Sequence, residues 1–429
     1  MMTNRPNILL VHWHDLGRHL GVYGAVGVDS PNLDRLAESG VRFDSAFAVS
    51  PLCSPARGAL FTGRYPHANG LMGLTHLGWE YHDQERTLPM HLRVAGYRTA
   101  LIGLQHESSD VRRLGFDVVD ECRDQNGRVE RETVADRSVA WIADAATSDR
   151  PFLLTVGFRE IHRPYPADQY PPDELDATSV PDWLPDNGAT RRDFAALQSA
   201  IRIGDRAVGR VLDALDQAGI RDDTWVIFTT DHGLAAPGAK GTLSDAGTGV
   251  ALIQRFPTAW GIAPGATDRL FSHVDLVPTI LDRLGLPVPD DVQGSSHAPW
   301  LEDATVARSE PVFTEKNFHD AYDPIRAVRT DRFKLIRNSE QRPRWVISGD
   351  IESSLSRVGV GDDHLEHRAP VELYDLETDP LETRNLAAEP AYAVRVAQLD
   401  AVLHRWQAAT GDPLLDGSIA RPPDPRFGG

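Results

Sequence analysis

Short continuous runs of apolar residues recur along the first half of the chain. Four of them, at 7–13, 98–103, 152–158 and 225–230, have the length and the aliphatic content of buried strands. Strands of a parallel sheet are apolar on both faces because helices cover both sides. The runs therefore predict the centre of a large, mostly parallel sheet sandwiched by helices.

Helical periodicity fills the intervals between these runs. Ser30-Pro31 is typical of a helix start and Gly40 of its end, and a second helical pattern covers 134–146. The longest pattern covers 191–218, where apolar residues recur mostly at spacings of three, four and seven. Alternation of strands and helices predicts the α/β fold class.

A different pattern follows a Pro-rich and acidic stretch that ends near residue 310. Residues 324–337 predict two antiparallel strands, 371–374 a further strand and 390–408 a closing amphipathic helix. We therefore expect a large catalytic α/β domain over 1–310. A smaller α+β subdomain with a short antiparallel sheet is expected over 311–429.

The excess of acidic residues restricts the kinds of partner that the protein can bind. The 429 residues include 44 Lys and Arg against 62 Asp and Glu, a formal net charge of −18. The averaged field of such a chain repels polyanions, so we expect neither nucleic acid nor an anionic membrane surface as a partner. A small anionic substrate is not excluded, because it meets only the charges of a local pocket.

Two cysteines, Cys53 and Cys122, are too few for a disulfide framework, which favours a reducing compartment. The N-terminal residues lack the long apolar core and small-residue cleavage site of a signal peptide. No run approaches the ~18 apolar residues of a membrane span. These features predict a soluble, cytoplasmic protein.

Candidate chemistry collects just after the predicted strands, where ligands bind in open α/β sheets. The residues at these positions are His14-Asp15, Gln105-His106, Glu160 with His162, and Asp231-His232. Two Asp–His pairs from separate strands could hold one divalent cation. Carboxylate and imidazole ligands leave its identity open among Mn, Zn, Fe and Ca. His12 lies within its strand and is interpreted as a core residue or a support for the site.

The sharpest motif is the stretch from Pro51 to Arg64, Pro-Leu-Cys-Ser-Pro-Ala-Arg-Gly-Ala-Leu-Phe-Thr-Gly-Arg. Its Pro pattern and the apolar run ending at Gly63 place Cys53 at or just before a helix N-terminus. Backbone N–H groups at such a terminus favour an anion, and Arg57 adds a guanidinium that can bind it in a bidentate manner.

The string Cys-x-Pro-x-Arg, two further residues, an apolar pair and Thr-Gly resembles the sulfatase signature at every position. The resemblance extends to the turns at Asp15 and Asp231 and to the late segment 373–386. Residues 66–74 and that late segment are most similar to the heparan N-sulfatase (sulfamidase) branch. The resemblance implies an alkaline-phosphatase-like fold. It also implies that a formylglycine-generating enzyme converts Cys53 to formylglycine, whose hydrate is the nucleophile.

The resemblance also implies roles for the other residues. The metal ligands would be His14, Asp15, modified Cys53, Asp231 and His232. Arg57 would orient the formylglycine, and His106 would assist breakdown of the sulfated hemiacetal. His162 would donate a proton to the leaving group, and Lys240 would bind a sulfate oxygen.

Three positions depart from the family pattern. Sulfatases usually carry Asp at the position of His14, commonly Asn at that of His232, and a sulfate-contacting Lys at that of Leu104. The family implies Ca, but two imidazoles in place of oxygen ligands make Mn or Zn an alternative. Leu104 removes one cation, so Gln105 or another residue replaces it, or the substrate differs.

The sequence therefore predicts a hydrolase that cleaves a sulfate ester or sulfamate on a small anionic, sulfated substrate, expected to be a saccharide. One alternative is a formylglycine phosphonate monoester or phosphodiester hydrolase, favoured by the two His residues. A further alternative, based on Leu104, is an inactive protein that binds sugar sulfates. The oligomeric state is left open.

Overall fold

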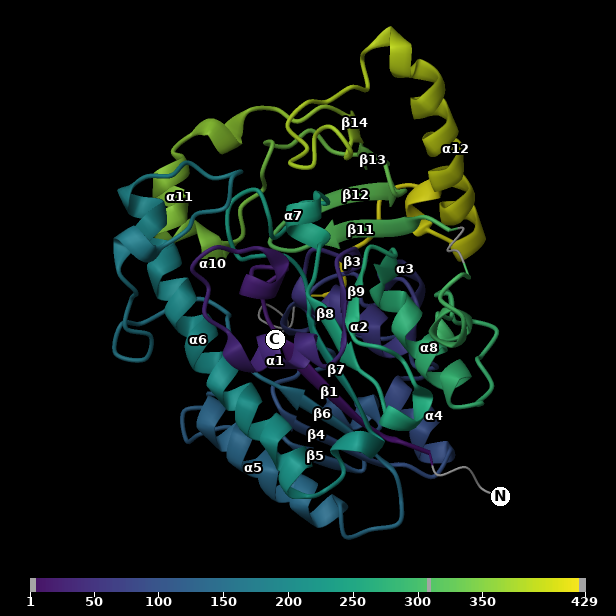
Figure 1. Ribbon diagram of the computed structural model, residues 1–429. Coiled ribbons are helices and arrows are strands. Elements are labelled where there is room, and N and C mark those ends of the chain that lie inside the picture. The colour runs from purple at the N-terminus through teal and green to yellow at the C-terminus, as the bar shows by residue number, and fades with distance from the viewer. Residues whose placement is uncertain (1–4, 307–309, 424–429) are drawn as a thin grey trace.

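The computed structural model describes residues 5–306 and 310–423. These residues form an eight-stranded sheet, a four-stranded sheet and a two-stranded pair. Helices flank the large sheet, and the four-stranded sheet lies above it in the view of Figure 1. The predicted α/β class, with a large mostly parallel sheet and a short antiparallel one, is confirmed.

The large sheet has the order β5-β4-β6-β1-β7-β8-β2-β9. Its parallel strands are β5 (Val118–Asp120), β4 (Arg98–Gly103), β6 (Phe152–Gly157), β1 (Asn7–Trp13) and β7 (Thr224–Thr230). The register pairs Trp13 with Thr230 and Gly103 with Gly157. The carboxyl ends of these strands therefore stop at one edge, and the four predicted central strands are correct to within one residue.

The shorter strands were not predicted. Besides β5, they are β2 (Val41–Phe43), β3 (Ala46–Phe47), β8 (Leu252–Arg255), β9 (Gly265–Thr267) and β10 (Phe271–Ser272). β8 runs antiparallel to both β7 and β2, so the sheet is mixed at this end. Strands of two to four residues carry too little periodicity to be recognised, and their conformation depends on the strand beside which they lie.

Helices cover both faces of the large sheet. One layer consists of α1 (Pro31–Glu38), α5 (Arg131–Ala145) and α6 (Gly188–Gln217), and the other of α2 (Cys53–Thr62), α4 (Leu88–Val94) and α8 (Leu276–Arg283). Successive side chains of β1 alternate between the layers, with Leu9 and Val11 facing the first and Ile8 and Leu10 the second. The three helices expected between the predicted strands are all in the first layer, and the helix expected at Cys53 is α2 of the second layer.

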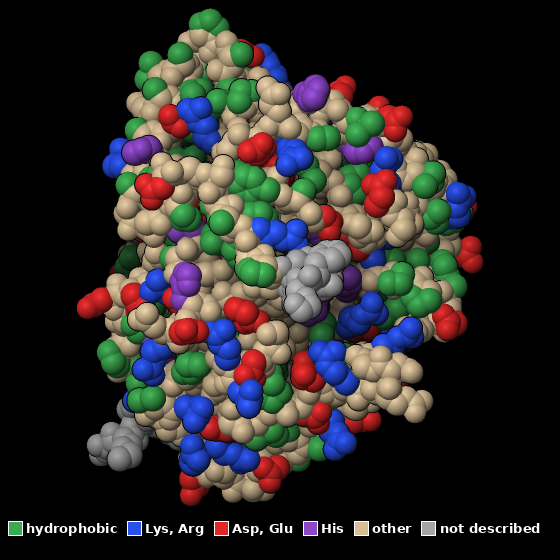
Figure 2. Space-filling view, turned by 180° about the vertical axis from the view of Figure 1, so that it is seen from behind, with side chains coloured by type: hydrophobic (Ala, Val, Ile, Leu, Met, Phe, Trp, Pro, Cys, Tyr) green, Lys and Arg blue, Asp and Glu red, His purple; other side chains and the backbone are tan. Residues whose placement is uncertain are grey.

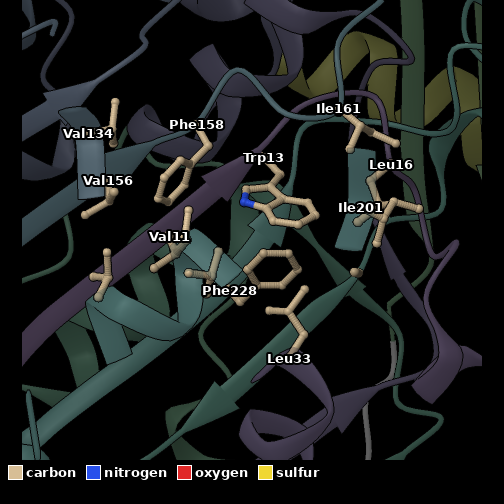
Figure 3. Packing of buried hydrophobic residues seen from close by; sticks show 14 of the residues in the cluster. Val11, Trp13, Leu16, Leu33, Val134, Val156, Phe158, Ile161, Ile201 and Phe228 are labelled. Carbon is tan, nitrogen blue, oxygen red and sulfur yellow. The ribbon is translucent and has the colours of Figure 1, made fainter. Parts of the chain in front are cut away.

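Trp13, the last residue of β1, anchors the strand immediately before the candidate site. Its ring meets Phe228 edge to face at 5.5 Å, and Figure 3 shows it among side chains from several elements. α6 approaches closely at Gly204, where a Cβ would lie 2.9 Å from the indole. The indole is fully buried, so its packing fixes the position from which the chain turns at His14 and Asp15.

The second sheet is antiparallel, in the order β11-β12-β13-β14. Its strands are β11 (Val312–Phe318), β12 (Tyr322–Arg329), β13 (Phe333–Asn338) and β14 (Val371–Asp375), and α12 (Ala393–Thr410) packs against it. The predicted strand pair and closing helix are present, whereas β11 was missed. The remaining short helices are α3 (Pro66–Asn69), α7 (Asp245–Thr248), α9 (Ala298–Glu302), α10 (Gly349–Glu352) and α11 (Leu355–Val360).

Two Lys side chains attach the second sheet to the connection between β7 and β8 of the first. Lys316 of β11 donates to the carbonyl oxygen of Gly241 at 2.9 Å and to Asp323 at 2.8 Å. Lys334 of β13 pairs with Asp245 of α7. Gly241 directly follows Lys240, so these contacts also set the position of a candidate catalytic residue.

Replacing Asp205 with Ala is expected to destabilise the fold by about 1–3 kcal/mol. The carboxylate of Asp205, on α6, accepts hydrogen bonds from the backbone N–H groups of Asn32 at 3.0 Å and Leu33 at 2.9 Å. These groups lie in the first turn of α1, where they have no partner within the helix, and Ser30 makes no side-chain cap. Urea denaturation measures the loss.

Asp213→Ala is the matched control, because Asp213 also links α6 to α1, through Arg35 at 2.7 Å. Both side chains of that pair are about half exposed, so the substitution is expected to cost less than about 1 kcal/mol. Equal losses in the two variants would contradict a capping role for Asp205.

Candidate active site

The two acidic turns meet at the carboxyl edge of the large sheet. His14 and Asp15 follow β1, Asp231 and His232 follow β7, and all four side chains are buried. Oδ1 of Asp231 accepts hydrogen bonds from the backbone N–H groups of Asp15 and His232, each at 2.9 Å. This carboxylate therefore joins the two strand ends, and Asp15 adopts a left-handed conformation (φ 53°) at the turn.

The ring of His232 presents a lone pair to a carboxylate. Its Nδ1 lies 2.9 Å from the carbonyl oxygen of Gly233, which only accepts, so Nδ1 carries the proton. Burial lowers the pKa of His232, and the neutral ring then has no proton on Nε2, which lies 3.1 Å from Oδ1 of Asp15. Two facing lone-pair atoms fit a cation, and the imidazole–carboxylate set suits a divalent metal.

His14 bridges two other charged groups. Its Nε2 lies 2.7 Å from Nη2 of Arg57, which only donates, so Nε2 accepts and Nδ1 carries the proton. Nδ1 lies 3.1 Å from Oδ2 of Asp231. Both ring nitrogens therefore face protein partners, and metal ligation through Nε2 would replace the contact with Arg57.

Cys53 is the first residue of α2 and is only 4% exposed. Its Sγ lies 3.3 Å from Nε2 of His232. Four residues each bring one possible ligand atom to within 4.8 Å of the others, namely His14, Asp15, Cys53 and Asp231. Burial raises the pKa of the Cys53 thiol well above its ordinary value, so the unmodified side chain is a neutral thiol in this arrangement.

Arg57 follows one helical turn after Cys53 and contacts Asp231 and Glu107, each at 3.4 Å, in addition to His14. Glu107 was missed by the sequence analysis. Its Oε2 accepts from the backbone N–H of His106 at 2.7 Å, and burial raises its pKa. Its only sequence signal was its place beside His106, because a single acidic residue in a loop forms no motif.

Lys240 lies between two carboxylates. Its Nζ is 3.1 Å from Oδ1 of Asp15 and 2.8 Å from Oδ2 of Asp350, and its side chain is buried. Asp350 lies on α10, in the long connection between β13 and β14, and was not predicted. The sequence carries no signal for it, because 110 positions separate Lys240 from Asp350.

The two remaining His residues complete one side of the site. The ring centroids of His106 and His162 lie 5.1 and 5.8 Å from that of His14. Burial lowers the pKa of His106 to about 3. Nδ1 of His162 donates to the carbonyl oxygen of Arg163 at 2.6 Å, leaving Nε2 at 3.9 Å from Asp15. The structure thus gathers every predicted site residue around Cys53.

Gln105 does not replace the Lys that the sulfatase pattern has at the position of Leu104. Its side-chain amide is occupied by its own loop, accepting from the N–H groups of Glu107 and Ser108 and donating to the Ser108 carbonyl. Leu104 is buried in the apolar core. Lys240 and Arg57 are therefore the cations that the described residues place beside Cys53.

Buried carboxylates, imidazoles and two cations lie around one helix terminus, at the carboxyl edge of an α/β sheet, and are suited to an enzyme that cleaves an anionic substrate. The chain matches the family model "Sulfatase" over residues 6–286. It also matches "N-sulphoglucosamine sulphohydrolase, C-terminal" over 240–352. The chain belongs to the sulfatase family and is a sulfate ester or sulfamate hydrolase.

Known proteins are similar over nearly the whole chain. Human N-sulphoglucosamine sulphohydrolase is 31% identical over 96% of this chain and 92% of its own length. Choline-sulfatase of Rhizobium meliloti is 27% identical, covering 98% and 91%. A solved putative sulfatase of Bacteroides fragilis superposes with a TM-score of 0.78 at 22% identity, covering 98% and 99%, which supports the fold.

On the face shown in Figure 2, acidic and basic side chains are interspersed over the surface. Among the helices of residues 5–306 and 310–423, none is long and apolar enough to cross a membrane.

Proposed function

We propose that the enzyme removes sulfate from a small sulfated saccharide, with Cys53 converted to formylglycine and one divalent metal beside it. The position of Cys53 carries this proposal, because the side chain begins α2 and lies 3.3 Å from His232. Ligand atoms of Asp15 and Asp231 lie within 4.8 Å of it. The saccharide is supported by the similarity to N-sulphoglucosamine sulphohydrolase.

Asp15, Asp231 and His232 would hold the metal together with an oxygen of modified Cys53, and His14 would join them by releasing Arg57. When bound, the metal would act as a Lewis acid on the sulfuryl group. The formylglycine hydrate would supply the nucleophilic hydroxyl and a second hydroxyl that allows sulfate release by return to the aldehyde. Maturation would require a formylglycine-generating enzyme.

The other site residues would stabilise the charge of the sulfuryl group and transfer protons. Lys240 and Arg57 would offset negative charge that develops on the sulfuryl oxygens, in a buried setting where such interactions are strong. Nε2 of His162, held by the Nδ1 contact with Arg163, would carry a proton to the leaving group. His106 would accept and return the proton of the hydroxyl that releases sulfate.

A second candidate, hydrolysis of a phosphonate monoester or phosphodiester by the same groups, is favoured by one observation. Nε2 of His232 lies 3.1 Å from Asp15 and would give the metal an imidazole nitrogen, where sulfatases commonly carry Asn. A softer metal would suit such a set.

Parallel assays of metal-reconstituted protein test the two candidates. We expect kcat/KM for an aryl sulfate and for N-sulfated glucosamine to exceed that for phenyl phosphonate. Larger turnover of the phosphonate would overturn the sulfatase proposal, and absence of turnover with all three substrates would favour the binding-protein alternative.

A further inference from the structure

Asp350 brings an acidic group to the site from the connection between β13 and β14. It lies on α10, and its Oδ2 accepts from Nζ of Lys240 at 2.8 Å while its Oδ1 accepts from the hydroxyl of Ser348. Burial alone would raise its pKa, but the charge of Lys240 and these hydrogen bonds hold the pKa below its ordinary value. The side chain is therefore a carboxylate.

Asp350 is more exposed to solvent than the site residues Asp15 and Lys240. The side chains of Asp15 and Lys240 are at most 2% exposed, whereas Asp350 is 19% and His162 is 25% exposed. Ligand atoms of Asp15, His162 and Asp350 lie within 4.8 Å of one another. Asp350 and His162 thus lie at the opening, on the side toward which a leaving group bonded to a buried sulfuryl group would project.

Holding Lys240 does not require Asp350. Both carboxylate oxygens of Asp15 already accept from Nζ of Lys240, at 3.1 and 3.3 Å. A carboxylate has about four acceptor sites, and Asp350 uses one for Lys240 and one for Ser348. It therefore retains acceptor capacity at the opening, beside the residue proposed to protonate the leaving group.

We propose that Asp350 is a specificity-determining residue that binds the leaving group and selects an amine over an alcohol at that position. This inference rests on the proposed function. A carboxylate favours a leaving group that becomes cationic, because a charge-assisted hydrogen bond is stronger than a neutral one. An alcohol leaves as a neutral molecule and gains less.

The overall reaction converts R–NH–SO₃⁻ and water to R–NH₃⁺ and SO₄²⁻. The S–N bond breaks, its electron pair stays on nitrogen, and the nitrogen is protonated as sulfur becomes bonded to the nucleophilic oxygen. The positive charge thus develops on the atom that Asp350 would face.

Asp350→Asn tests the proposal in the metal-reconstituted enzyme. We expect the ratio of kcat/KM for N-sulfated glucosamine to that for 4-nitrophenyl sulfate to fall about tenfold or more, because one charge-assisted hydrogen bond is lost. Asp350→Glu should restore part of the ratio. Glu352→Gln on the same short helix, whose side chain is 58% exposed, should leave the ratio unchanged.

Binding of the amine product gives a readout that does not depend on turnover. By calorimetry, glucosamine should bind the unaltered protein about tenfold more tightly than N-acetylglucosamine, and Asp350→Asn should remove this preference. Equal loss of turnover for both sulfated substrates, or an unchanged binding preference, would overturn the role of Asp350. Absence of sulfate and sulfamate turnover by the unaltered enzyme would instead count against the proposed function.

Discussion

Cys53→Ala is expected to lower turnover of sulfated substrates by at least about 10³-fold while leaving the fold intact. The substitution removes the side chain that maturation would convert to the nucleophile. The groups around it, Asp15, Asp231 and His232, are held by backbone contacts that do not involve Cys53. Hydrolysis of 4-nitrophenyl sulfate measures the loss, and circular dichroism with thermal unfolding checks the fold.

Cys122→Ala is the matched control for this variant. Cys122 is the other cysteine of the chain, is also buried, and contacts Asp120 rather than any candidate site residue. Its replacement should leave turnover unchanged. Near-normal activity in Cys53→Ala would contradict the formylglycine mechanism.

Mass spectrometry of the peptide containing Cys53 tests the same mechanism without an assay. Protein from a host that matures sulfatases should show the loss of mass expected when the thiol and a hydrogen are replaced by an aldehyde oxygen. A fully unmodified thiol in active protein would contradict the proposal, because the enzyme would then work without formylglycine.

Removal of divalent metal by a chelator is expected to lower turnover by at least about a hundredfold, because Lewis-acid stabilisation of the transition state is worth several kcal/mol. Mn or Zn should restore more activity than Ca. The reason is His232, whose Nε2 lone pair faces Asp15 at 3.1 Å and would provide a nitrogen ligand that a hard cation disfavours. Metal analysis and titration of the stripped protein measure both effects.

His232→Asn tests the origin of this metal preference. The amide oxygen would supply an oxygen ligand in place of the imidazole nitrogen, so the variant should shift toward reactivation by Ca. Asp231 and Asp15 keep their mutual contact, which is made by the backbone of Asp15. Reactivation of the unaltered enzyme by Ca alone would show that the imidazole does not set the preference.

Local sequence patterns were sufficient to predict the central strands of the large sheet and the start of α2. Buried parallel strands need continuous apolar runs, and β1, β4, β6 and β7 were therefore predicted to within one residue. The Cys-x-Pro-x-Arg motif carried its own helix start, so the position of Cys53 at the beginning of α2 was also predictable. The first and last residues of long helices were less certain, since α6 begins three residues before the predicted start, where Asn187 caps it.

The sequence by itself thus determined the α/β class, the family and the residues that follow the central strands, because each depends on neighbouring positions in the chain. Only the tertiary structure decided which of these residues meet, that His14 bridges Arg57 and Asp231, and that Glu107 and Asp350 belong to the site. Asp350 reaches Lys240 because buried contacts hold the second sheet beside the first. Such proximity arises from packing between distant segments, which no local pattern encodes.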